Sequence, residues 1–119
     1  MSDFSPDPGS APAHEGIVVL TTWPADRDAA PFARALVEER LAACVGVLPE
    51  MRSHYRWAGG VQDEAERQIL IKTTRGRIEA LRARVAVLHP YDVPEWLVLR
   101  AEGSPAYATW LHGSVAPLA

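Results

Sequence analysis

The feature that most constrains the fold of this chain is a long segment, residues 44–74, that lacks helical periodicity. Within it, residues 51–57 read MRSHYRW, in which arginine or histidine occupies every second position. Such alternation places the remaining side chains together on one face of a β-strand. Gly59 and Gly60 supply turn residues, and a second apolar run follows them. The segment therefore predicts a long β-hairpin with its turn at these glycines and a bend at Pro49.

The segments that precede this hairpin predict one strand and one helix. The β-branched run GIVVLTT ends before a Trp-Pro pair, which predicts a buried strand over residues 17–22. Apolar residues spaced four apart from Phe32 onward then predict a helix that ends near Ala42. Because proline removes a backbone hydrogen bond inside a helix, we expect this helix to begin late, near Asp28, or to kink at Pro31.

The segments that follow the hairpin predict a helix, a strand and a second short helix. Apolar residues recur three and four apart over residues 78–88, after Thr74 as a candidate N-cap and before Pro90. The run EWLVLRAE predicts a fourth strand. Ser104 and Pro105 then provide a cap and a first-turn proline for the last helix.

These elements give the order βαββαβ with an added C-terminal helix. The order is typical of an α+β, ferredoxin-like sandwich, in which two helices cover one face of a four-stranded antiparallel sheet. The opposite face would be bare, and here the long hairpin between the second and third strands carries Tyr55, Trp57, Val61 and Ile69. We therefore expect the chain to associate with copies of itself.

Composition limits the remaining possibilities. The chain has 119 residues and a formal net charge of −3, which fits one domain without affinity for nucleic acid. Its apolar runs are too short to span a membrane. Residues 1–15 are acidic and rich in proline, which predicts a disordered tail before a single domain at residues 16–119. The tail does not resemble a secretory signal, and the single cysteine fits a reducing compartment, so a cytoplasmic protein is expected.

Few residues suggest chemistry, and the common enzyme signatures are absent. His89 lies in the stretch LHPYDVPEW, where an imidazole can bind a metal with Asp92 or Glu95 as oxygen ligands. Alternatively, His89 caps the end of a helix and has only a structural role. Cys44 is either a soft metal ligand or a buried inert thiol. Lys72, the only lysine, either binds an anion in a cleft or is a charge at the end of a strand.

Six motifs, taken in order, resemble one known family. The segments VVLTTWP, ARALVEERLAACV, YRWAGGV, LIKTTR, LHPYDVPE and SPAYATWL closely resemble the divalent-cation tolerance protein CutA, over nearly all of residues 17–111. The resemblance implies a ferredoxin-like subunit in a homotrimer, similar to the trimeric nitrogen-regulatory PII proteins. It also implies a link to tolerance of copper and other divalent metals, without an established enzymatic reaction.

The resemblance also implies roles for particular residues. The motif positions place candidate metal ligands at His89 and Cys44. Five further positions correspond to residues around clefts between subunits: Tyr55, Trp57, Lys72, Tyr91 and Pro94. No cysteine lies in Thr21-Thr22-Trp23-Pro24, where some members have one, so one subunit cannot form a copper site with two thiols.

The expected function is that of a trimeric metal-tolerance protein that binds copper or another divalent cation and is not a catalyst. One alternative is a small-molecule sensor of the PII type that binds an anion near Lys72. Another is a structural partner of a second protein. One lysine and a few aromatic residues do not choose between these two alternatives.

Overall fold

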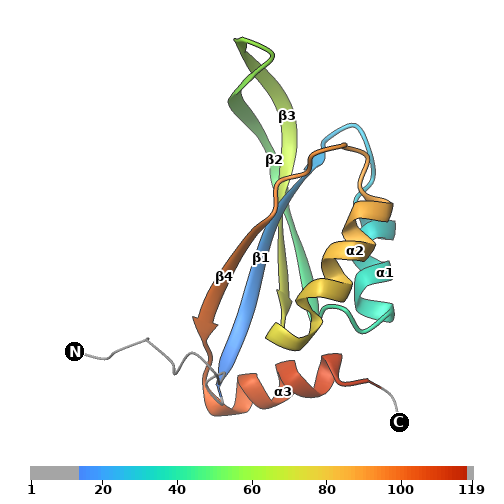
Figure 1. Cartoon of the computed structure of the whole chain (residues 1–119), viewed down its shortest axis with the longest axis vertical. Coiled ribbons are helices and arrows are strands. Elements are labelled where there is room, and N and C mark those ends of the chain that lie inside the picture. Colours follow the sequence, from blue (N-terminus) through green and yellow to red (C-terminus); the bar gives the residue numbers. More distant parts are fainter. Residues whose placement is uncertain (1–13, 118–119) are drawn as a thin grey trace, which may run out of the picture.

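The computed structural model describes residues 14–117 and contains one antiparallel sheet with helices packed against it (Figure 1). The elements are β1 (Glu15–Pro24), α1 (Ala30–Glu38), β2 (Cys44–Trp57), β3 (Gly60–Thr73), α2 (Ile78–Leu88), β4 (Leu97–Glu102) and α3 (Pro105–Val115). Most of the tail predicted to be disordered lies outside the described residues. Glu15, which was assigned to that tail, is instead the first residue of β1.

The strands lie in the order β2-β3-β1-β4, and every neighbouring pair is antiparallel. The central strand β1 pairs with β3 on one side and with β4 on the other, so Val18 lies opposite both Lys72 and Leu99. This topology confirms the predicted α+β, ferredoxin-like fold. It also makes β2 and β4 the two edges of the sheet.

Helices α1 and α2 cover one face of the sheet (Figure 1). Alternate residues of β1, such as Ile17 and Val19, are buried on that face, as the period of a strand requires. Leu36 of α1 and Leu81 of α2 pack into the same core, and neither side chain is exposed to solvent. Helix α3 begins at Ser104, whose Oγ accepts a hydrogen bond from the Tyr107 backbone N–H at 3.3 Å, as predicted.

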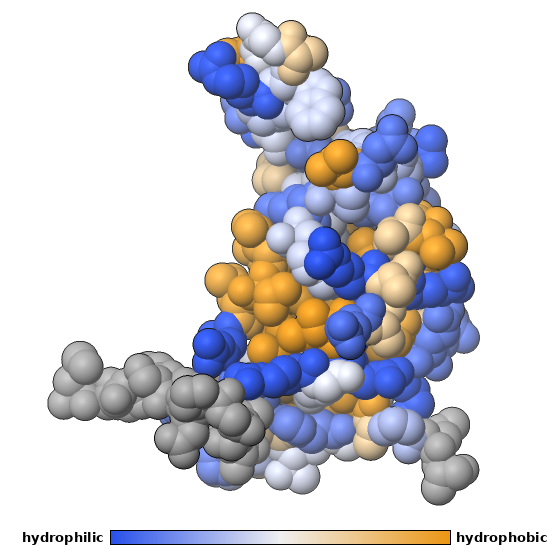
Figure 2. Space-filling model, in the orientation of Figure 1, coloured by the Kyte–Doolittle hydropathy of each residue, from blue (hydrophilic) through white to orange (hydrophobic). Residues whose placement is uncertain are grey.

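The opposite face remains apolar and only partly covered. Figure 2 shows hydrophobic residues gathered in the middle of the molecule, where Figure 1 has β4 and β1. Leu97 and Leu99 of the edge strand β4 are 52% and 50% exposed. The β2–β3 hairpin extends past the other strands, and Trp57 near its tip is 59% exposed. Within residues 14–117, no helix is long and apolar enough to cross a lipid bilayer.

The structure corrects the predicted turn of the hairpin. Trp57 pairs with Gly60, so the two-residue loop consists of Ala58 and Gly59, and Gly60 begins β3. Both loop residues have positive φ angles, 52° and 80°. This matches a type I′ turn, whose twist suits antiparallel strands. The bend expected at Pro49 is confirmed as an irregularity in the strand pairing between Val47 and Glu50.

The helix ends also differ from the sequence prediction. Helix α1 begins at Ala30, with Pro31 in its first turn, and ends at Glu38 rather than near Ala42. The Arg40 backbone takes a positive φ of 58°, which ends the helix, and its side chain donates hydrogen bonds to the carbonyls of Gly113 in α3 and of Ala116 after it. Thr74 precedes a short 3₁₀ turn at Arg75–Arg77 rather than α2 itself, and its side chain makes no capping hydrogen bond.

Candidate functional site

His89 lies at the C-terminal end of α2 and connects that helix to strand β1. Its ring Nδ1 accepts a hydrogen bond from the Tyr91 backbone N–H at 3.0 Å, so Nε2 carries the ring proton. Nε2 donates that proton to the Thr22 carbonyl oxygen at 2.7 Å. His89 is 7% exposed, and its ring meets that of Trp23 edge-on, with 5.2 Å between the ring centroids. Burial lowers the pKa of His89 below its usual value, which favours the neutral ring.

The loop that follows His89 brings Tyr91 over the base of the hairpin. The Tyr91 hydroxyl donates a hydrogen bond to Oε2 of Glu66 on β3 at 2.9 Å. Burial and this hydrogen bond to a carboxylate raise the pKa of the Tyr91 phenol, so the phenol keeps its proton and remains a donor. Pro90 and Pro94 restrict the backbone on either side of this segment. The loop therefore forms one wall of a cleft whose other wall is the hairpin.

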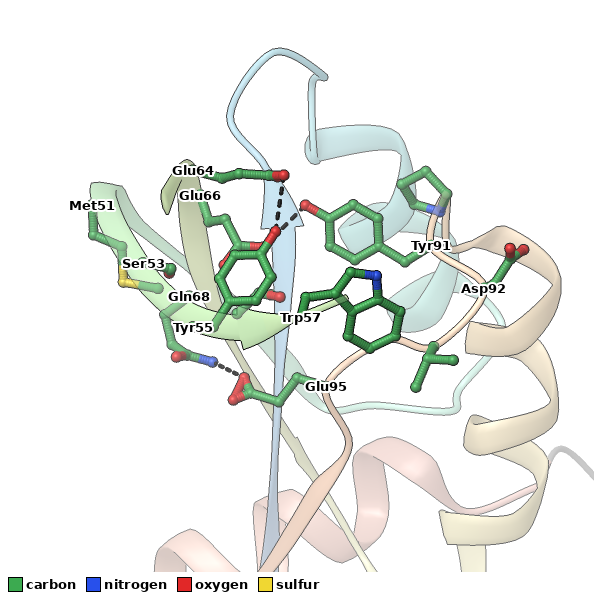
Figure 3. Close-up of a pocket in the computed structure, with 13 residues that line it drawn as sticks. Met51, Ser53, Tyr55, Trp57, Glu64, Glu66, Gln68, Tyr91, Asp92 and Glu95 are labelled. Carbon is green, nitrogen blue, oxygen red and sulfur yellow. Dashed lines mark hydrogen bonds between the residues drawn. The ribbon is translucent and has the colours of Figure 1, made fainter. Parts of the chain in front are cut away.

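The cleft has a volume of about 720 Å³. It is bounded by the inner face of the hairpin, the adjacent end of β1 and the α2–β4 loop. Figure 3 shows the rings of Tyr55, Trp57 and Tyr91 around this cavity, together with several carboxylates. The lining residues are Thr22, Met51, Ser53, Tyr55, Trp57, Glu64, Glu66, Gln68, Pro90, Tyr91, Asp92, Val93 and Glu95.

The cleft is strongly acidic. Its lining includes the carboxylates of Glu64, Glu66, Asp92 and Glu95, and no Lys, Arg or His of residues 14–117 lines it. The hydrogen bonds that these carboxylates accept come from neutral groups. Tyr55 donates its hydroxyl proton to Glu64 at 2.9 Å, and the Gln68 amide donates to Glu95 at 2.8 Å (Figure 3). The hydrogen bond to Glu64 is the main reason that the pKa of Tyr55 is raised.

The predicted metal ligands do not form one cluster. Asp92 and Glu95 both line the cleft, but each ring nitrogen of His89 is already engaged in a hydrogen bond. Cys44 begins β2 and pairs with Lys72, whereas Thr22, which binds His89, pairs with Gln68. These two levels of β3 are four residues apart, or roughly 13 Å along a strand. In the described part of the chain, no three His, Cys, Asp or Glu side chains are grouped closely enough to hold a metal ion.

The predicted cleft residues separate into two groups. Tyr55, Trp57 and Tyr91 line the acidic cleft, and Pro94 lies in its loop wall without lining the cavity. Lys72 lies elsewhere, with its ammonium nitrogen 5.9 Å from the centre of the Tyr107 ring. It lines a second, smaller cavity of about 290 Å³ between the sheet and α3.

Three further residues of the cleft, Glu64, Glu66 and Gln68, were not predicted from the sequence as site residues. Their position on β3 was nevertheless open to prediction. In the structure, Ser53 pairs with Glu64 and Met51 with Glu66, which places both carboxylates on the same face as Tyr55. The predicted turn at Gly59 and Gly60 shifts the strand pairing by two residues. Because side chains alternate between the faces with a period of two, that turn would also have placed both carboxylates on this face. The available signal was therefore the set of polar residues at every second position of β3: Gln62, Glu64, Glu66 and Gln68.

Comparison with known proteins gives a consistent family assignment. The family model described as CutA1 divalent ion tolerance protein matches residues 17–114. The divalent-cation tolerance protein CutA of Thermus thermophilus is 50% identical over 96 residues, which cover 80% of this chain and 93% of that protein. The solved structure of a divalent cation tolerance protein from Thermus thermophilus has a TM-score of 0.80, with 46% identity over 85% of this chain and 99% of the other.

A second solved structure extends this comparison. The PII-like protein CutA from Nostoc sp. PCC 7120, in its apo form, has a TM-score of 0.77 and 33% identity. The match covers 84% of this chain and 97% of the Nostoc chain.

Proposed function

Because this chain belongs to the CutA1 divalent ion tolerance protein family, we propose that it is a homotrimer that binds divalent cations at the acidic cleft. The observation that carries this proposal is the lining of the cleft, which has four carboxylates and no basic side chain from residues 14–117. Carboxylate oxygens are suitable ligands for divalent cations. The low-dielectric walls of a cleft also concentrate its negative potential.

The proposed ion is held weakly and retains part of its hydration shell. Support for this comes from the absence of any group of three potential ligands at coordinating distance within residues 14–117. Copper at His89 would have to break either the hydrogen bond with Tyr91 or that with Thr22. We therefore propose that Glu64, Glu66, Asp92 and Glu95 provide the attraction, and that Cu²⁺ competes there with other divalent ions.

The proposal of a trimer is supported by surfaces that a single chain leaves open. Strand β4 is an edge of the sheet, and all six of its residues are exposed, including Leu97 and Leu99. An apolar edge strand with unpaired backbone groups promotes association with another chain. The hairpin extends past the other strands and exposes Trp57 near its tip (Figure 1). Three copies related by one rotation axis would cover the edge strand β4 in a closed assembly.

A small-anion sensor is the second function raised by the sequence. The acidic cleft opposes it, because four carboxylates repel an anion. An anion would have to bind at Lys72 in the smaller cavity, which Glu102 also lines.

Light scattering and native mass spectrometry test the assembly. We expect three times the mass of one chain at micromolar concentration. Leu99→Arg places a charge on the exposed apolar strand β4 and should yield monomers. The matched control is Val87→Arg, because Val87 is 72% exposed on α2. A trimer that persists in Leu99→Arg, or a monomeric parent protein, would contradict the proposed assembly.

Titration calorimetry tests cation binding. Cu²⁺ and Mn²⁺ should each bind the parent protein, and the affinity should fall as ionic strength rises. Glu95→Gln should weaken binding severalfold, whereas Glu79→Gln on the exposed side of α2 should leave it unchanged. Equal affinities in the two variants would exclude the cleft as the binding site.

A further inference from the structure

The acidic cleft is much larger than a metal ion requires. A volume of about 720 Å³ lies within the range of sites that enclose small organic molecules, roughly 300–1,000 Å³. A preformed metal site would instead draw its ligands together around one point. The described residues contain no such group of three ligands. Size and ligand spacing thus both indicate a ligand larger than a bare ion.

The walls of the cleft are suited to an organic cation. The rings of Tyr55, Trp57 and Tyr91 border the same cavity (Figure 3). The faces of these rings carry partial negative charge and attract ammonium or guanidinium groups. Met51 and Val93 add apolar surface for a hydrocarbon chain. A hydrated metal ion would make little use of such walls.

The burial of Glu66 provides a further indication. It is 8% exposed and lines the cavity, and its side chain accepts a hydrogen bond from the neutral Tyr91 hydroxyl. None of the ion pairs among residues 14–117 includes Glu66. A buried carboxylate without a cationic partner is unfavourable, and a cation in the cleft would supply that partner.

We propose that the cleft binds a small organic amine whose ammonium group lies between the aromatic rings and the carboxylates of Glu64 and Glu66. The inference rests on the proposed cation-binding function, because it uses the same cleft and the same charge. It goes further by naming the class of ligand. An amine with a short hydrocarbon chain satisfies the charge, the aromatic walls and the volume together. A second ammonium group would be able to approach Glu95 or Asp92, which line the same cavity.

Three probes of equal length test this proposal by titration calorimetry on the intact native assembly. They are cadaverine, a five-carbon diamine; pentanediol, its neutral counterpart; and glutarate, its dianionic counterpart. We expect cadaverine alone to bind, with an affinity that falls as ionic strength rises. Binding of pentanediol or glutarate as tight as that of cadaverine would overturn the assignment. The absence of cadaverine binding at millimolar concentration would also overturn it. That outcome is expected if a neighbouring copy fills the cleft.

Two variants locate the binding site. Glu64→Gln removes one charge but keeps an oxygen that accepts the Tyr55 hydroxyl, and should weaken cadaverine binding about tenfold. Glu50→Gln is the matched control: Glu50 lies on the same hairpin but pairs with Arg67, on the face opposite Tyr55. Its affinity for cadaverine should be unchanged. Equal effects of the two variants would contradict the proposed site.

Trp57→Leu separates this inference from metal binding. It removes a ring but no charge, so cadaverine affinity should fall about threefold to tenfold while Cu²⁺ and Mn²⁺ affinities stay the same. If its assembly mass differs from that of the parent, Tyr55→Leu replaces it. In the parent protein, cadaverine binding without metal binding would reject only the proposed metal function. Metal binding by the parent without cadaverine binding would reject only this inference, as would an unchanged cadaverine affinity in both ring variants.

Discussion

Replacement of His89 by alanine tests whether this residue is structural or a metal ligand. The variant loses the hydrogen bond from Nε2 to the Thr22 carbonyl, at 2.7 Å, and the one that Nδ1 accepts from the Tyr91 N–H, at 3.0 Å. Each bond contributes about 1 kcal/mol, and its loss leaves a partly buried backbone group without a partner. Lost packing of the buried ring against Trp23 adds about 1 kcal/mol. We therefore expect the free energy of unfolding to fall by about 3 kcal/mol.

Urea denaturation at one fixed protein concentration measures this loss, because association would otherwise change the apparent stability. The melting temperature should fall by roughly 10–15 °C. His89→Gln should recover part of the loss, since its amide N–H is able to donate to the Thr22 carbonyl. His54→Ala, at an exposed position on the hairpin, is the control and should change stability little.

The opposite result would refute this reasoning. If His89→Ala unfolds at the same urea concentration as the parent and loses Cu²⁺ binding, the imidazole is a metal ligand rather than a connection between the α2–β4 loop and β1. A stability loss equal to that of His54→Ala would likewise show that the two hydrogen bonds contribute nothing.

Three further predictions concern stability. Because burial lowers the pKa of His89 below 6.5, the unfolded chain binds a proton at a higher pH than the folded chain does. The contribution of His89 to stability should therefore be full above pH 6.5 and decrease below it. Melting curves of His89→Gln should lack this pH dependence. Ala58→Asn should raise the urea midpoint and add about 0.5–1 kcal/mol, because asparagine tolerates the positive φ of 52°; a lower midpoint would argue against this turn. Arg75→Gln should lower the free energy of unfolding by about 2 kcal/mol, because the Glu15 carboxylate, 5% exposed, loses its ion pair. An unchanged urea midpoint in Arg75→Gln would show that this ion pair contributes nothing to stability.

The order of the elements could be predicted from the sequence because it depends on local patterns. The β-branched run at residues 17–22 predicts a buried strand from its own residues. The observed strand β1 is longer and spans Glu15–Pro24. The end of α2 at Leu88, before Pro90, follows from the geometry of proline. Ser104 caps α3 by accepting a hydrogen bond from the Tyr107 backbone N–H, only three residues away. The βαββαβ order then leaves few ways to arrange a sheet.

Element ends were predicted less well where distant residues decide them. Helix α1 ends at Glu38 because the Arg40 backbone takes a positive φ of 58°, and the Arg40 side chain donates hydrogen bonds to carbonyls of Gly113 and Ala116, more than seventy positions along the chain. The hairpin turn uses Ala58 although two glycines follow, because strand pairing sets the register. An L-residue with positive φ is unfavourable in isolation, so a local rule prefers the glycines.

The amino-acid sequence by itself determined the fold class and the long hairpin, since these follow from periodicity within elements and from their order, whereas the family resemblance supplied the aromatic residues of the cleft. The tertiary structure alone decided which side chains meet. It engaged His89 with Thr22, separated Cys44 and Lys72 from the cleft, and brought Glu64 and Glu66 to face Tyr91 across it. Periodicity acts over a few residues, whereas the charge of a cleft is a sum over strands and loops that only folding brings together.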